Sequence, residues 1–112
     1  MGMKTAIATS NSRQLTEQIL KVHRLLDDFD AIVTADEVEK GKPDPQIYLQ
    51  AAEKSGIWPR DCLVFEDVTM GILAGKRAGM QVCAIRDKFS DFQWEKKKNL
   101  ADFSIEEYTQ IL

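Results

Sequence analysis

The sequence predicts a three-layer α/β fold, a parallel β-sheet with helices on both faces. Short apolar runs typical of strands alternate along the chain with segments whose apolar residues keep helical spacing, and the connections between them are short. The stretch LVFEDVTMGILAGKRAG, residues 63–79, contains one complete unit of this alternation. Its first three residues are apolar and predict a strand buried on both faces, and a helix follows directly.

Small residues predict a close contact between this helix and the sheet. They recur at helical spacing along one face, as Gly71, Ala74, Gly75 and Ala78. A face with so little side chain allows the helix backbone to approach the strands. Gly79 is expected to end the helix in a left-handed conformation.

The remaining elements follow the same alternation. Strands are expected at residues 4–8, 31–34, 82–85 and 101–103, and helices at residues 12–28, 45–55, 91–100 and 104–112. The first helix should bury Leu15, Ile19 and Val22, with Arg13 facing outward. The basic run at residues 96–98 is expected on a solvated helix face.

Local signals place the ends of the second and last helices. Asp44 supplies an N-cap and Pro45 the first helical position of the second helix, and Gly56 ends it. Its expected inward residues are Ile47, Tyr48, Ala51 and Ala52. Residues 104–107 match a capping box, which predicts the start of the last helix.

Composition narrows the class of protein. The 112 residues predict a single domain, and 44% hydrophobic and 29% charged residues are ordinary for a soluble globular protein. A net charge of -3 gives no basic surface for nucleic acid. No apolar run reaches membrane-spanning length and no secretory signal is recognisable, so a cytoplasmic protein is expected. Cys62 and Cys83 lie in or beside strand candidates, as buried reduced thiols do.

Polar residues cluster where predicted strands end or in the loops beside them. They are the turn Thr9-Ser10-Asn11, Lys42 in the loop KGKPDP, and the acidic pair Glu66 and Asp67. A hydroxyl, backbone N–H groups entering a helix and a fixed lysine are suited to a phosphoryl group. Adjacent carboxylates are suited to magnesium. The carboxyl ends of parallel strands lie at one edge of a sheet, so the three groups should converge there.

Each group also has an ordinary structural interpretation. Thr9 fits a strand-end hydroxyl and Lys42 fits a surface loop lysine. Glu66 and Asp67 fit the capping of the helix that follows them, because carboxylates stabilise the positive end of a helix.

Taken together and in order, these motifs resemble the haloacid dehalogenase (HAD) superfamily. The segment IATSNS resembles its second motif, GKPDPQIYLQAA its third and VFEDVTMGILAGKRAGM its fourth. Within the superfamily the chain is most similar to phosphatases and phosphomutases of the β-phosphoglucomutase and phosphoglycolate phosphatase type. The resemblance implies a Rossmann-like core and Mg²⁺-dependent chemistry on small phosphorylated metabolites.

The resemblance also implies roles for individual residues. The implied phosphate ligands are Thr9, Ser10, Asn11 and Lys42. Lys42 would in addition neutralise charge on the phosphoryl group and the nucleophile. Asp67 would hold Mg²⁺, directly or through water, and Glu66 would assist it. Val68 departs from the pattern, in which serine or threonine is usual, so a less well capped helix is expected.

The nucleophile of the superfamily is missing from the chain. That aspartate belongs to a DxD motif at the end of the first strand, and the D-x-D of this chain, Asp28-Phe29-Asp30, follows a helix instead. A helical cap domain is also absent. Residues 1–112 therefore resemble the C-terminal half of a HAD core that lacks its first strand, a truncated core. Without the aspartate no phosphoenzyme forms, so the chain alone is expected to be inactive.

Two classes of function remain open. In the first, the chain belongs to a HAD phosphatase whose N-terminal half is supplied by another polypeptide or lost by truncation. In the second, it is a non-catalytic remnant or assembly module with at most weak phosphate and magnesium binding. In either case the missing strand would leave the edges of residues 5–8 and 63–65 unpaired. Exposed edges pair between chains, so a homo-oligomer, in the simplest case a dimer, is expected.

Overall fold

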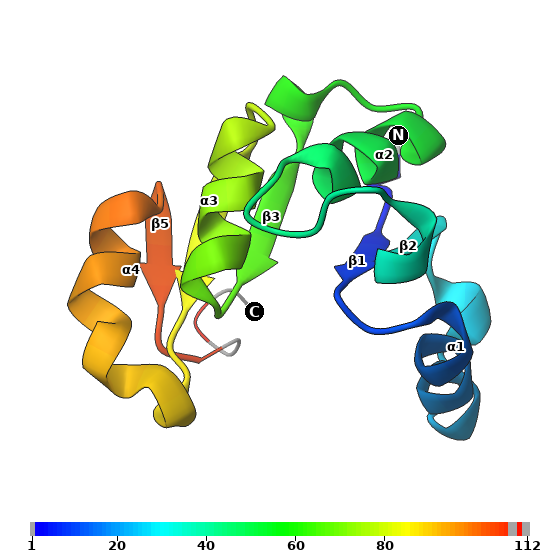
Figure 1. The fold of residues 1–112 in the computed structure, drawn as a ribbon, viewed down its shortest axis with the longest axis horizontal. Coiled ribbons are helices and arrows are strands. Elements are labelled where there is room, and N and C mark those ends of the chain that lie inside the picture. The colour runs from blue at the N-terminus through cyan, green and yellow to red at the C-terminus, as the bar shows by residue number, and fades with distance from the viewer. Residues whose placement is uncertain (1, 108–109, 111–112) are drawn as a thin grey trace.

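The computed structural model describes residues 2–107 and residue 110. Its strands are β1 (Ala6–Thr9), β2 (Ala31–Thr34), β3 (Leu63–Glu66), β4 (Gln81–Ile85) and β5 (Phe103–Ile105). Its α-helices are α1 (Arg13–Val22), α2 (Gln46–Ser55), α3 (Thr69–Arg77) and α4 (Trp94–Leu100) (Figure 1). Every strand pair is parallel, which confirms the predicted α/β class.

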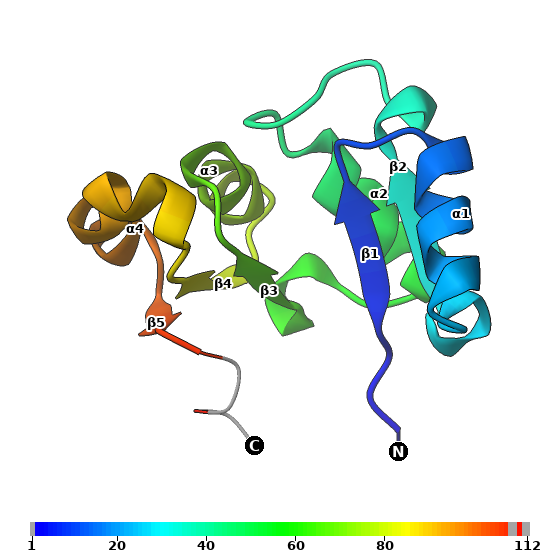
Figure 2. The ribbon, with the colours of Figure 1, turned by 90° about the horizontal axis from the view of Figure 1, so that it is seen from below.

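The strands form two sheets. One sheet contains β1 and β2, and the other has the order β3-β4-β5. Among the described strands, none pairs with both β1 and β3, whose edges lie side by side without bonding (Figure 2). The split lies between the two strands that the resemblance to the HAD superfamily expects a further strand to separate.

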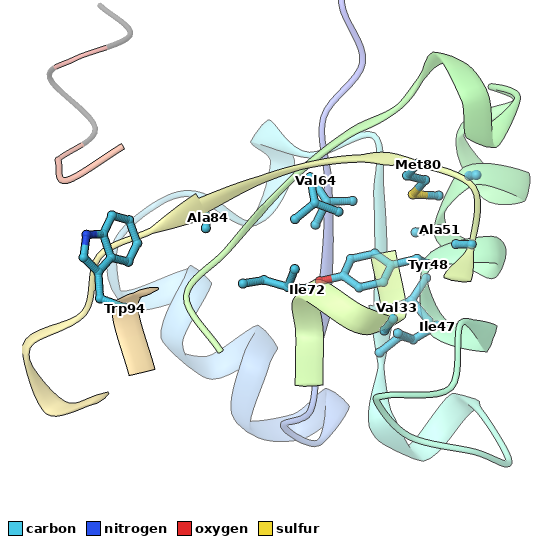
Figure 3. Packing of buried hydrophobic residues seen from close by; sticks show 13 residues of the cluster. Val33, Ile47, Tyr48, Ala51, Val64, Ile72, Met80, Ala84 and Trp94 are labelled. Carbon is cyan, nitrogen blue, oxygen red and sulfur yellow. The ribbon is translucent and has the colours of Figure 1, made fainter. Parts of the chain in front are cut away.

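Helices join the two sheets. α2 packs on β1 and β2 and also contacts α3, which in turn packs on β3 and β4. α3 and α4 cover the same side of the three-stranded sheet, whereas α1 and α2 flank the two-stranded one (Figure 2). One apolar cluster continues across both parts, from Val33 and Ile47 through Ile72 to Val82 and Trp94 (Figure 3). The common core holds the sheets together although no strand bridges them.

The close contact predicted for α3 is confirmed. All four small residues of its inner face are buried: Gly71, Ala74, Gly75 and Ala78. A Cβ atom added at Gly75 would lie 2.7 Å from Cγ2 of Val82, closer than real Cβ contacts occur. Gly79 has a φ of 81°, as expected for a left-handed residue after the helix.

The prediction for α2 is also confirmed. The residues expected to face inward are buried: Ile47, Tyr48, Ala51 and Ala52. Gly56 ends the helix with a φ of 70°. The helix begins one residue later than expected, and Asp44 Oδ1 accepts a 2.9 Å hydrogen bond from the backbone N–H of Gln46.

The prediction for the first helix is wrong in length and in its buried face. α1 ends at Val22, and Arg24 has a φ of 56°, which an α-helix cannot accommodate. Leu15 and Ile19 are exposed, and the buried residues of α1 are Thr16 and Leu20. The apolar stripe lies on the side of α1 turned away from β2, the strand it contacts.

Only one face of β3 is buried, in contrast to the prediction. Val64 and Glu66 point into the core, whereas Leu63 is 48% exposed. Phe103 of β5 is 51% exposed. The reason is that α3 and α4 lie on one side of this sheet, and no described helix covers the other (Figure 2).

The C-terminal third differs from the prediction in three respects. Lys97 is 1% exposed, although the basic run was expected to be solvated, and its ammonium group donates to Oγ of Ser90. β5 is shifted two residues from the expected strand and includes Ser104, which therefore does not cap a helix. The prediction of a last helix at residues 104–112 is wrong at its start, because residues 104 and 105 belong to β5 and residues 106 and 107 are not helical. Residues 108, 109, 111 and 112 of that prediction lie outside the described residues.

Two further sequence predictions concern cysteine and membranes. Cys62 and Cys83 are free thiols, the first half-buried and the second buried. In the described part of the chain no helix combines the length and the apolar character that crossing a bilayer requires.

Candidate functional site

The residues proposed to bind phosphate begin at the end of β1. The backbone N–H of Asn11 donates to Thr9 Oγ1 over 3.1 Å, which turns the chain sharply after the strand. Ser10 and Asn11 are exposed. Ser12 then caps α1 by accepting a hydrogen bond from the N–H of Leu15. The turn therefore presents a hydroxyl and backbone N–H groups near the start of a helix.

Lys42 links the two sheets at the same edge. It lies in the loop between β2 and α2, and its Nζ donates to the carbonyl of Ala8 over 3.3 Å and to Glu66 Oε2 over 2.9 Å. Ala8 precedes Thr9 in β1, and Glu66 ends β3. The structure therefore brings Lys42 close to both the Thr9 turn and the acidic pair.

Glu66 is a buried carboxylate with donors on both oxygens. Oε2 accepts from Lys42 and from the hydroxyl of Tyr48, the latter over 2.6 Å. Oε1 accepts from the backbone N–H groups of Asp67 and Val68 over 3.2 and 3.3 Å. Burial by itself would raise the pKa of Glu66, but the charge of Lys42 and the hydrogen bonds lower it below its usual value.

Tyr48 was predicted as a core residue and not as part of the site. Burial, followed by the charge of Glu66, raises the pKa of its phenol well above the usual value, so the hydroxyl remains a donor. The ammonium of Lys42 also lies 5.0 Å from the centre of its ring. A buried tyrosine needs a partner for its hydroxyl, but sequence alone does not identify that partner.

Asp67 is the exposed member of the acidic pair. Partial burial of its carboxylate and the neighbouring charge of Glu66 raise its pKa. A cation would relieve this repulsion, so the residue fits a magnesium ligand. Within residues 2–107 and 110, no three His, Cys, Asp or Glu side chains are grouped closely enough to form a metal site of their own. Asp67 could supply only part of a coordination sphere.

The start of α3 supports both interpretations of the acidic pair. Val68 is the N-cap residue and its side chain makes no capping hydrogen bond, as expected from its departure from the family pattern. Glu66 takes over part of this task by accepting the N–H groups that precede the helix. Capping and participation in the site are therefore compatible in Glu66.

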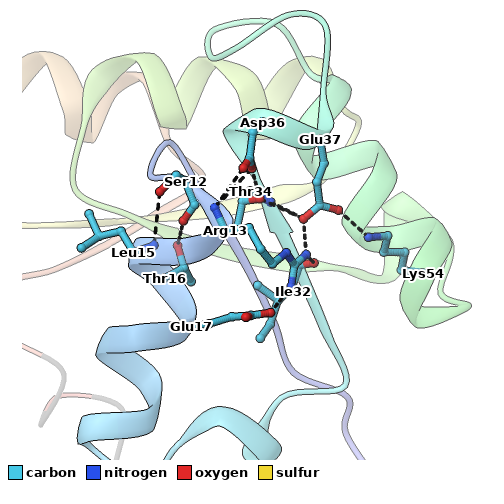
Figure 4. Close-up of polar contacts among 10 residues, drawn as sticks. All are labelled: Ser12, Arg13, Leu15, Thr16, Glu17, Ile32, Thr34, Asp36, Glu37 and Lys54. Atoms are coloured by element: carbon cyan, nitrogen blue, oxygen red, sulfur yellow. Dashed lines mark hydrogen bonds and ion pairs between the residues drawn. The ribbon is translucent and has the colours of Figure 1, made fainter.

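A second polar network stabilises the edge from the side of β2 (Figure 4). Arg13 at the start of α1 pairs with Glu37, which follows β2, and Glu37 also accepts from Lys54 of α2 over 2.8 Å. Asp36 accepts from the backbone N–H of Arg13, and Thr34 donates to both acidic residues. Arg13 thus lies within a network, although it was expected to face solvent.

The D-x-D sequence lies at the opposite end of the two-stranded sheet. Asp30 directly precedes β2, and its Oδ2 accepts a 2.7 Å hydrogen bond from the N–H of Thr5, which precedes β1. Lys42 and Thr9 lie at the carboxyl ends of these strands. Asp28 and Asp30 are therefore too far along the sheet to serve as the nucleophile of this site, as the sequence indicated.

Comparison with known proteins identifies relatives with phosphatase names. The chain is 30% identical to hexitol phosphatase B of Escherichia coli over 110 residues, which is 98% of this chain and 49% of that protein. It is 44% identical to the bifunctional riboflavin kinase/FMN phosphatase of Arabidopsis thaliana over 85 residues, 75% of this chain and 22% of the relative. The chain thus spans less than half the length of these relatives.

Solved structures show the same fold. A HAD phosphatase from Thermococcus onnurineus superposes with a TM-score of 0.81 at 28% identity, over 98% of this chain and 49% of that one. A β-phosphoglucomutase from Clostridium difficile gives a TM-score of 0.83 at 22% identity, over 98% and 45% of the two chains. The family model for haloacid dehalogenase-like hydrolases matches residues 1–85. The chain therefore belongs to the haloacid dehalogenase-like hydrolase family.

Proposed function

We propose that this chain provides the phosphate- and magnesium-binding part of a phosphatase or phosphomutase that acts on small phosphorylated metabolites. The observation that carries the proposal is the position of Lys42, whose ammonium group joins the end of β1 to Glu66 of β3. This places a fixed positive charge between the Thr9 turn and Asp67, where a phosphoryl group and its counter-ion would meet.

The proposed site contains phosphate ligands from two segments and a magnesium ligand from a third. Lys42 would neutralise a phosphoryl oxygen, and the hydroxyl of Thr9 would donate to another. Ser10 and Asn11 would add N–H or side-chain donors from the exposed turn. Asp67 would hold Mg²⁺, which when bound lowers the negative charge of the phosphoryl group. Glu66 would assist through its charge, because its oxygens already accept hydrogen bonds.

The nucleophilic aspartate has to come from a segment outside these 112 residues. Asp28 and Asp30 lie away from the proposed site, and Asp67 is assigned to the metal. A phosphoenzyme cannot form without a nucleophile, so this chain alone would bind phosphate weakly and hydrolyse nothing. The hexitol phosphatase and the riboflavin kinase/FMN phosphatase named above are each at least twice as long as the region that this chain matches.

A binding titration tests the proposal. Titration of the chain with inorganic phosphate in the presence of Mg²⁺, followed by NMR, should perturb residues 9–11 and 42. Lys42→Met should weaken binding about tenfold to a hundredfold, the loss expected for a charge-assisted hydrogen bond. Lys40→Met is the matched control, because Lys40 is an exposed lysine of the same loop.

Two results would contradict the proposal. One is phosphate binding that is unaffected by Lys42→Met. The other is turnover of a phosphate monoester by the purified chain alone that disappears in Asp67→Ala, because it would show a complete active site without an added aspartate.

A second candidate, assembly between copies, is favoured by the split between the sheets. We propose that the chain forms a homo-oligomer, in the simplest case a dimer, through one of the strand edges at β1 or β3. Among the described strands, β1 pairs only with β2, and β3 only with β4. A strand edge that no neighbouring strand covers can associate with a strand of another chain. The proposal does not depend on catalysis and is tested separately.

A further inference from the structure

We propose that Tyr48 is a positioning residue which, by fixing Glu66, holds the ammonium group of Lys42 between the ends of β1 and β3. Tyr48 lies on α2, Glu66 on β3 and Lys42 in the loop before α2. The link between Tyr48 and phosphate binding rests on the proposed function. The hydrogen bonds among Tyr48, Glu66 and Lys42 are independent of it.

Both donors reach the same carboxylate oxygen. The Tyr48 hydroxyl and the Lys42 ammonium lie 2.6 and 2.9 Å from Glu66 Oε2. Tyr48 is 6% exposed and Glu66 9% exposed, so little water competes for these contacts. Hydrogen bonds to a buried charged acceptor are short and strong, and losing one leaves a group that water cannot satisfy. Tyr48 therefore limits the rotation of the carboxylate that anchors Lys42.

The other oxygen of Glu66 is fixed as well. Oε1 accepts the backbone N–H groups of Asp67 and Val68, which cannot move without disturbing the start of α3. With two donors on each oxygen, the carboxylate has its hydrogen-bonding capacity filled. Glu66 thus acts as an anchor for Lys42, and ligation of a cation falls to Asp67.

Gly71 provides the space that this carboxylate occupies. A Cβ atom at position 71 would lie 2.0 Å from both Cδ and Oε2 of Glu66. Any side chain at position 71 would therefore displace the group that binds Tyr48 and Lys42. Gly71 leaves space for the Glu66 carboxylate, and the hydroxyl of Tyr48 donates to it, so both residues keep the carboxylate in place.

NMR of the lysine ammonium groups tests the inference directly. An ammonium group held by buried hydrogen bonds exchanges slowly with water and gives a visible signal. In the wild-type chain the Lys42 signal should be present, and Tyr48→Phe should abolish it while keeping the aromatic ring. The buried Lys97, which donates to Ser90, is an internal control whose signal should persist. Lys42→Met assigns the signal.

A control variant on the same helix separates the loss of the hydroxyl from a general loss of α2 packing. Leu49→Ala, on the exposed side of α2, should leave the Lys42 signal unchanged. Loss of the Tyr48 hydroxyl should remove the Lys42 signal and keep the Lys97 signal, because only Lys42 shares its carboxylate acceptor with Tyr48.

The outcomes separate this inference from the proposed function. If Tyr48→Phe leaves the Lys42 signal as in the wild type, Tyr48 is not a positioning residue. If the Lys42 signal is lost in Tyr48→Phe but neither protein binds inorganic phosphate, the positioning role holds and the proposed function fails. If phosphate binds, Tyr48→Phe should weaken it about threefold to tenfold, the effect of one hydrogen bond.

Discussion

Glu37 is the acidic residue that links α1, β2 and α2 at the edge of the sheet. The hydrogen bond from Lys54, followed by those from Arg13 and Thr34, lowers the pKa of Glu37 to about 2 from an ordinary value of 4.5. A lowered pKa in the folded state means that the ionised form stabilises the fold. This stabilisation is present above pH 4.5 and is lost as the pH falls towards 2.

Glu37→Gln should therefore lower stability at neutral pH and flatten its dependence on acid. Loss of the charged acceptor should cost on the order of 1–3 kcal/mol at pH 7. Urea unfolding at a series of pH values between 7 and 2 measures this, because the variant should lose less stability than the wild type below pH 4.5. Glu53→Gln, at an exposed position of α2, is the control. Parallel pH profiles for wild type and Glu37→Gln would disprove the role of Glu37.

Among the helices, α3 was predicted best, because its signal is local. Small residues at helical spacing mark a face that can contact a sheet closely, and Gly79 marks the end. The face of α1 was predicted wrongly because an apolar stripe has the same spacing whether it meets a sheet or points outward. Leu15 and Ile19 point outward, and the spacing of apolar residues alone does not distinguish an outward stripe from one that meets a sheet.

The contact between α3 and β4 gives a prediction on stability. Gly75→Val should destabilise the chain by about 1–3 kcal/mol, because even its Cβ would lie 2.7 Å from Val82 Cγ2. Helix propensity alone would slightly favour the change, because glycine is a poorer helix former than valine, so a loss of stability reports the packing against β4. Thermal or urea unfolding measures it. Unchanged or increased stability would show that Val82 moves aside without cost.

For the candidate site, too, local motifs were informative and contacts made by tertiary packing were not. Motifs at strand ends and in the loop before α2 predict Thr9, Lys42 and Asp67 as site residues, since parallel strands bring their carboxyl ends to one edge. The structure brings Lys42 close to β1 and to Glu66. The bond between Tyr48 and Glu66 joins residues 18 positions apart through tertiary packing, and no local pattern records it. The burial of Lys97 was missed in the same way, because neighbouring lysines give no sign of which one turns inward.

The two sheets of the molecule share a core but not a strand. Val33 and Ile47 on one side and Val64 and Ile72 on the other belong to a single apolar cluster. Lys42 adds a polar link at the carboxyl ends of β1 and β3. Packing by α2 and α3 therefore holds the two parts together, while the backbone edges of β1 and β3 have no described strand between them.

Strand edges that no described strand covers predict association between copies of this chain. A strand of another copy can pair with such an edge, and burying the exposed side chain of Leu63 of β3 would add to the gain in free energy. Light scattering on the purified chain should report a dimer or higher homo-oligomer. Leu63→Lys should shift it towards monomer, since a charge beside an edge strand opposes pairing. Leu49→Lys, on the exposed side of α2, should leave the assembly unchanged. A wild-type chain that is folded and monomeric would refute pairing between copies and point instead to an extended segment of a different polypeptide as the natural partner of the two edges.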